Sequence, residues 1–118
     1  MNVVHKELNA SRWHTMTLME QMGNVGSEVS RALRARSHQN TARERAALDR
    51  FLELIDLTIA DPRVQARRKE LCRVREVVCD FFLGENEYGS TPESLNRYFL
   101  PFAEAARSQR PKRGSCGG

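Results

Sequence analysis

The sequence predicts an all-α protein, folded as an up-down-up-down antiparallel four-helix bundle. Four segments place apolar residues three and four positions apart, which is the spacing of an amphipathic helix, and none shows the alternation of a strand. Capping residues, prolines or both mark where these segments begin. The connections between them are short, which favours antiparallel neighbours. The expected helices cover residues 17–38, 40–60, 62–83 and 92–108.

Size and composition indicate one globular domain. The chain has 118 residues, of which 40% are hydrophobic and 29% are charged, and this is enough for one core. No apolar run is long enough to span a membrane, and the run near the start is too short for a signal peptide, so we expect a cytoplasmic protein. We expect an N-terminal extension over residues 1–14, the bundle over residues 15–108, and a disordered, flexible basic tail over residues 109–118.

The first helix is expected to begin with Thr17 and Glu20, which are spaced as in a capping box. Gly23 and Gly26 follow inside this helix, where each destabilises it by about 1 kcal/mol relative to alanine. A phosphate-binding loop would need a strand before these glycines and a lysine after them, and neither is found. The two glycines therefore predict the close approach of a neighbouring helix or subunit.

The other helices begin with similar signals. These are the capping-box spacing of Thr41 and Glu44, and the dipeptides Asp61-Pro62 and Thr91-Pro92, in which a capping side chain precedes a proline. Inside the fourth helix, Pro101 removes a backbone hydrogen bond. We therefore expect this helix to bend or break near Leu100.

The segment DFFLGENEYGST, residues 80–91, is interpreted as the connection between the third and fourth helices. Gly84 is expected to take the left-handed conformation that ends the third helix. Asp80, Glu85 and Glu87 could instead form a metal site, but their spacing is not that of a calcium loop. The connection is therefore the preferred interpretation.

Two polar patterns predict ion pairs on the helices. Arg31 is expected to pair with an acidic residue of the second helix, and Arg73, Glu76 and Asp80 are spaced to pair within the third helix. Neither pattern includes the Glu-x-x-His pairs typical of two-metal sites in bundles, and no serine, cysteine or aspartate sits beside a histidine in a way that suggests a nucleophile with its base. We therefore expect a non-enzymatic protein with no catalytic residue, metal, cofactor or small-molecule substrate.

Three leucines indicate an interface. Leu54 and Leu57 point away from the main apolar face of the second helix, and Leu100 points away from that of the fourth. Several exposed leucines on a small bundle suggest a surface for a subunit or a partner. We therefore expect a homo-oligomer.

The positive charge is expected to gather at one end of the bundle. The net charge of +4 and the pI near 9.3 are modest, so the distribution of charge matters more than its sum. Up-down topology brings the second connection, the end of the fourth helix and the tail together, with few carboxylates among them, chiefly Asp61, Glu70 and Glu104. Such an end would bind the phosphates of RNA or DNA, although solvation alone is the alternative. The candidate nucleic-acid-binding residues are Arg63, Arg67, Arg68, Lys69, Arg107, Arg110, Lys112 and Arg113.

Five segments between Trp13 and Arg107 resemble a set of small uncharacterised prokaryotic four-helix-bundle proteins. The segments are NVGSEVSRA, LELIDLTIADPR, KELCRVREVVCDFF, NEYGST and YFLPFAEAAR. In fold and charge, the chain is also similar to the accessory variability proteins of diversity-generating retroelements, which are oligomers that engage a reverse transcriptase and RNA. This similarity implies an accessory or adaptor protein that binds nucleic acid or a nucleoprotein partner such as a reverse transcriptase. The alternative is a protein-protein interaction module, antitoxin-like or a scaffold, without nucleic-acid contact.

Overall fold

The computed structural model describes residues 12–109, and within this range the chain is all-helical without a strand, as the sequence predicts. The elements are α2 (Leu18–Ser37), α3 (Thr41–Ala60), the short 3-10 helix η1 (Pro62–Arg67), α4 (Arg68–Leu83) and α5 (Pro92–Gln109). The predicted helix bounds agree with these to within one residue, except that the third helix begins as η1. The predicted tail beyond Gln109 and residues 1–11 of the predicted extension lie outside the described residues.

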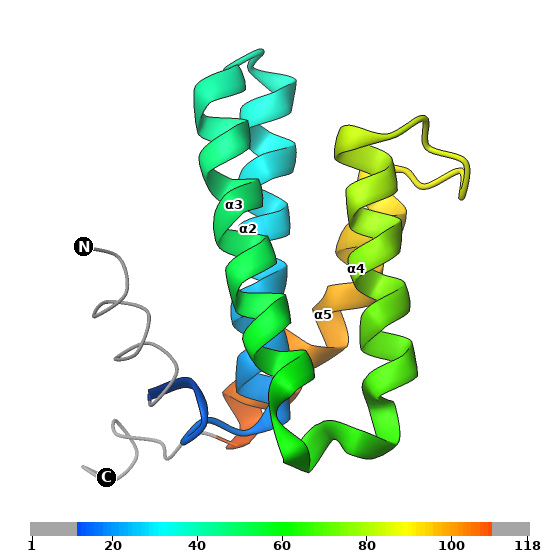
Figure 1. The fold of residues 1–118 in the computed structure, drawn as a ribbon. Coiled ribbons are helices and arrows are strands. Elements are labelled where there is room, and N and C mark those ends of the chain that lie inside the picture. Colours follow the sequence, from blue (N-terminus) through cyan, green and yellow to red (C-terminus); the bar gives the residue numbers. More distant parts are fainter. Residues whose placement is uncertain (1–11, 110–118) are drawn as a thin grey trace, which may run out of the picture.

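The helix α2 lies at the centre of the fold, where it packs closely against α3 and α5. Figure 1 shows α2 and α3 side by side, connected at one end by a tight turn. The chain then crosses the base of the molecule through η1, returns along α4, and passes behind α4 into α5. None of the described helices combines the length and the apolar character needed to span a membrane.

With η1 counted as the start of the third helix, the four helices begin within one residue of the predicted starts, and three of the four predicted caps are confirmed. The capping box of α2 is complete, because the amide of Glu20 donates to Thr17 Oγ1 and the amide of Thr17 donates to Glu20 Oε1. Asp61 caps η1 through the amide of Arg63. Thr91 Oγ1 accepts from the amide of Ser94 in the first turn of α5.

The capping box predicted at Thr41 and Glu44 is wrong. Asn40 caps α3 instead, because its side-chain oxygen accepts from the amide of Arg43 at 3.1 Å. Asn40 has non-helical backbone angles, whereas Thr41 is already the first residue of the helix. Asparagine and threonine are both strong capping residues, so neighbouring candidates are hard to separate by sequence.

The glycines of α2 meet α5, as the sequence predicts. A Cβ atom added to Gly26 would lie 2.7 Å from the Cβ of Phe99, and one added to Gly23 would lie 3.6 Å from the Cα of Ala103. The missing side chain of Gly26 therefore lets Phe99 of α5 approach the backbone of α2, whereas the contact at Gly23 has an ordinary distance. The helix α5 continues through Pro101 to Gln109, so the proline does not end it.

The expectation that Leu54 faces solvent is wrong. Leu54 is only 5% exposed and belongs to the hydrophobic core. The indole of Trp13 lies one turn further along α3, with its Nε1 donating to Thr58 Oγ1 at 2.9 Å, and Thr58 donates to the carbonyl of Leu54. Trp13 thus belongs to the core, although it falls in the predicted N-terminal extension. Leu57 is partly buried against the core, and Leu100 is 51% exposed.

Two further expectations are wrong: the ion pair between Arg31 and the second helix, and the left-handed conformation of Gly84. Arg31 pairs with Glu28 of its own helix at 2.7 Å, because the side chains three residues apart face each other. Gly84 ends α4 in an extended conformation, with φ of −108°, and the left-handed residues of the connection are Asn86 and Gly89. Gly84 is needed for space, since a Cβ there would lie 3.1 Å from the carbonyl oxygen of Asp80.

Candidate nucleic-acid interface

Arg63, the first of the predicted cations, is held in a polar network at the base of the fold. Its guanidinium donates to Asp61 Oδ2 at 2.6 Å and to the carbonyl of Met16 at 2.8 Å. Asp61 is 1% exposed and also accepts from the side-chain amide of Gln21. The hydrogen bonds from Arg63 hold the pKa of Asp61 far below its usual range, against the opposing effect of burial. Arg63 therefore has a structural role.

Arg67 is held between α4 and α5. Its Nε donates to Glu70 Oε1 at 2.9 Å, and its Cζ lies 5.3 Å from the ring centroid of Phe102. The hydroxyl of Tyr98 donates to the same carboxylate at 2.6 Å. Burial alone would raise the pKa of Glu70, but the hydrogen bonds from Tyr98 and Arg67 outweigh burial and lower it.

Two of the predicted cations pair with carboxylates that the sequence places at this end. Asp61 neutralises Arg63, and Glu70 neutralises Arg67. Arg107 is exposed in the last turn of α5, and it does not join the other predicted cations in a hollow. Arg110, Lys112 and Arg113 lie outside the described residues.

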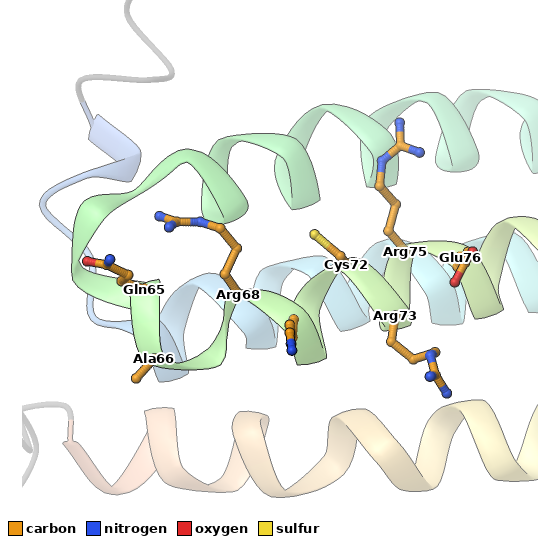
Figure 2. Close-up of a pocket in the computed structure, with 8 residues that line it drawn as sticks. Gln65, Ala66, Arg68, Cys72, Arg73, Arg75 and Glu76 are labelled. Atoms are coloured by element: carbon orange, nitrogen blue, oxygen red, sulfur yellow. The ribbon is translucent and has the colours of Figure 1, made fainter.

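Arg68 and Lys69 are brought together with two other cations on the outer side of α4. They line an open hollow of about 740 Å³, which we call the α4 groove (Figure 2). Four of its lining residues are cationic and one is a carboxylate. The residues that line the α4 groove are Gln65, Ala66, Arg68, Lys69, Cys72, Arg73, Arg75 and Glu76.

The four cations of the α4 groove differ in how they are held. Arg68 donates to the carbonyl of Ile59 at 2.9 Å and so supports the end of α3, where the last carbonyls lack helical partners. Arg75 donates to Asp56 Oδ1 at 2.8 Å and connects α4 with α3. In Figure 2 both arginines extend from α4 toward α3.

Of the four cations of the α4 groove, Arg73 and Lys69 have neither an ion pair nor a hydrogen bond with another residue in the described range 12–109. In Figure 2 Arg73 extends to the other side of α4, toward α5. Its Cζ lies 5.8 Å from the ring centroid of Tyr88. Lys69 is exposed, and it has no hydrogen bond with another described residue. These two positive charges are therefore available to an anion from solution.

The predicted ion pairs among Arg73, Glu76 and Asp80 are wrong. Glu76 accepts a hydrogen bond from the hydroxyl of Tyr88, and Asp80 accepts from backbone amides of the connection after α4. Their partners come from the next segment of the chain, which the helical spacing does not reveal.

Arg73 and Arg75 line the α4 groove but were not among the predicted residues, although the sequence holds a signal for them. In the segment RRKELCRVR, positions 68, 72 and 75 follow helical spacing, as do positions 69, 73 and 76. Two adjacent stripes of this kind form one face of a helix. This face lines the α4 groove, whereas the predicted basic residues were assigned to one end of the bundle.

The α4 groove can bind phosphate by charge and by hydrogen bonds from guanidinium and ammonium groups. No three histidine, cysteine, aspartate or glutamate residues in the described part of the chain are grouped as metal ligands. Comparisons of the chain with protein-family models, with curated proteins and with solved structures gave no match.

Proposed function

We propose that the protein is a non-enzymatic accessory or adaptor protein that binds nucleic acid, alone or within a nucleoprotein partner such as a reverse transcriptase. Its scaffold is an up-down-up-down antiparallel bundle with a fourth helix bent at Pro101. The α4 groove is the docking surface, because four of its lining side chains are cationic and only Glu76 is acidic. Arrays of this kind attract the phosphate backbone regardless of base sequence.

Lys69 is the residue that tests this proposal most cleanly. It lines the α4 groove without a partner in the described chain, so its replacement disturbs no contact seen in the structure. It lies in the first turn of α4, where a glutamate is favoured by the helix dipole. Lys69→Glu should therefore fold normally and weaken binding by about tenfold at low salt.

Arg43 offers a matched control. It is exposed in the first turn of α3, at the opposite end of that helix from η1, and its side chain has no ion pair with a described residue. Arg43→Glu and Lys69→Glu each lower the net charge from +4 to +2. Fluorescence anisotropy with a labelled oligonucleotide should show a loss only for Lys69→Glu. Equal affinities for the two variants, or no binding by the wild type, would contradict the proposal.

A protein-protein interaction module is the second candidate, and Leu100 is the observation that favours it. This side chain is 51% exposed on α5, and a second copy of the chain would be its simplest partner. Sedimentation velocity should then show a concentration-dependent dimer that Leu100→Ser abolishes. A monomeric wild type at all concentrations would exclude this form of self-association.

A further inference from the structure

The connection between α4 and α5 places an aromatic side chain beside the α4 groove. The hydroxyl of Tyr88 donates to Glu76 Oε1 at 3.2 Å, and the Cζ of Arg73 lies over the Tyr88 ring at 5.8 Å. Glu76 and Arg73 both line the groove. Tyr88 nevertheless remains 49% exposed, so a large part of this aromatic side chain is open to solvent.

The backbone around Tyr88 is fixed by other residues. The two carboxylate oxygens of Asp80 accept from the amides of Glu87 at 2.9 Å and Tyr88 at 3.1 Å. The side chain of Asn86 donates to the carbonyl of Ser90 and accepts from its amide. The loop is therefore held without help from the Tyr88 ring, and the ring is positioned before any ligand arrives.

We propose that the α4 groove binds single-stranded nucleic acid, with one unpaired base stacked on the ring of Tyr88. This inference rests on the proposed function and adds the class of nucleic acid. The phosphates would lie on Lys69 and Arg73, and the base would cover the ring face that Arg73 leaves open. Single-strand binding sites combine these two elements, a cationic groove that follows the backbone and an aromatic platform for the bases.

A duplex does not fit this arrangement equally well. Its bases are stacked on one another, so their faces are closed to an aromatic side chain, whereas its phosphates remain available. Tyr88 can therefore discriminate between the two forms, and Lys69 cannot. The two residues make separable contributions to binding.

The experiment compares a short single-stranded oligonucleotide with the blunt duplex of the same sequence, using Tyr88→Leu and Tyr88→Phe. Leucine keeps apolar volume without an aromatic face, and phenylalanine keeps the face without the hydroxyl. The wild type should prefer the single strand. Tyr88→Leu should weaken single-strand binding about 5- to 150-fold and leave duplex binding unchanged. Tyr88→Phe should bind both forms as the wild type does.

The outcomes separate this inference from the proposed function. If Tyr88→Leu binds the single strand as well as the wild type, or if Tyr88→Phe loses as much affinity as leucine, stacking on Tyr88 is overturned. Equal wild-type affinity for both forms would overturn it as well. In each of these cases a loss on Lys69→Glu still supports docking in the α4 groove. If the wild type binds neither form, both proposals fall.

Discussion

The two glycines of α2 differ in the space around them, and this difference is measurable. At Gly26 an added methyl group would lie 2.7 Å from the Cβ of Phe99, an atom too close to the α5 backbone to move easily. Gly26→Ala should therefore destabilise the fold by about 1–3 kcal/mol through overpacking, despite the helix preference of alanine. Urea denaturation followed by circular dichroism measures this change.

Gly23 is the control for the same substitution in the same helix. A methyl group there would meet Ala103 at 3.6 Å, which is an ordinary contact. Gly23→Ala should raise the free energy of unfolding by up to about 1 kcal/mol, because alanine favours the helix. Stabilisation by both substitutions would show that α5 does not lie against Gly26.

Asp61 predicts how stability depends on pH. Hydrogen bonds from Arg63 lower the pKa of Asp61 in the folded protein below the ordinary value of 3.8. The unfolded chain therefore takes up the proton first, so the contribution of Asp61 to stability is complete above this value and is lost as the pH falls below it. Asp61→Asn should lower the free energy of unfolding at neutral pH by about 2–3 kcal/mol. The free energy of unfolding of this variant should also decrease less as the pH falls than that of the wild type.

Asp49 serves as the control for Asp61. Its carboxylate is 67% exposed and lies 3.5 Å from Arg45, a geometry in which an ion pair contributes little. Asp49→Asn should change the free energy of unfolding by less than about 0.5 kcal/mol at neutral pH. The decrease of this free energy at acid pH should be the same as in the wild type. Equal effects of the two substitutions, measured by urea denaturation across the pH range, would contradict the assignment of the buried pair.

At this scale the sequence predicts local contacts and misses distant ones. The capping role of Asp61 is predicted, because its partner is two residues away. Its hydrogen bond with Gln21 is not, since forty residues separate them and only the folded chain brings them together. The same limit applies to the hydrogen bond from Arg63 to the carbonyl of Met16, since forty-seven residues separate these two.

Among the elements, α3 shows how a short segment before a helix can complete a core. The periodicity of α3 indicates one inward face, and the buried side of the helix extends beyond it to Leu54 and Thr58. Trp13 lies at this edge, where its Nε1 donates to Thr58 Oγ1, and the spacing alone does not identify the covering segment. The expected interface at Leu54 was thus part of the core.

Trp13 should therefore contribute strongly to stability. It is 5% exposed, and its Nε1 donates to Thr58. Trp13→Ala should destabilise the fold by about 3–5 kcal/mol through the lost burial and the cavity, whereas Trp13→Phe should destabilise it less. Thermal unfolding by circular dichroism measures both. An unchanged melting temperature for Trp13→Ala would mean that the segment before α2 does not pack on α3.

For the whole molecule, the α4 groove lies along one side of the fold, whereas the sequence predicted a positive surface at one end of it. The sequence predicted the helical content and the helix bounds, because periodicity and caps are local. It placed Arg68 and Lys69 among the binding residues, but not the neighbours that complete the α4 groove. Which cations remain free depends on carboxylates and carbonyls of other elements, and these are set by packing.

The salt dependence of binding should report how many cations of the α4 groove contact phosphate. Lys69 and Arg73 have no ion pair in the described chain, whereas Arg68 and Arg75 are held by Ile59 and Asp56. If only the first two neutralise phosphates of a single strand, the logarithm of the affinity should fall with the logarithm of salt at a slope of about −1.4.

The basic residues after Gln109 would add to this slope, so they must be removed from the measurement. A variant in which glutamine replaces Arg110, Lys112 and Arg113 isolates the α4 groove. In this background Lys69→Glu should reduce the slope by about one phosphate contact, or 0.7. A slope near −2.8 before that substitution would mean that Arg68 and Arg75 exchange their protein partners for phosphate. A slope near zero would exclude a phosphate-binding role for the α4 groove, because no counterions would then be released.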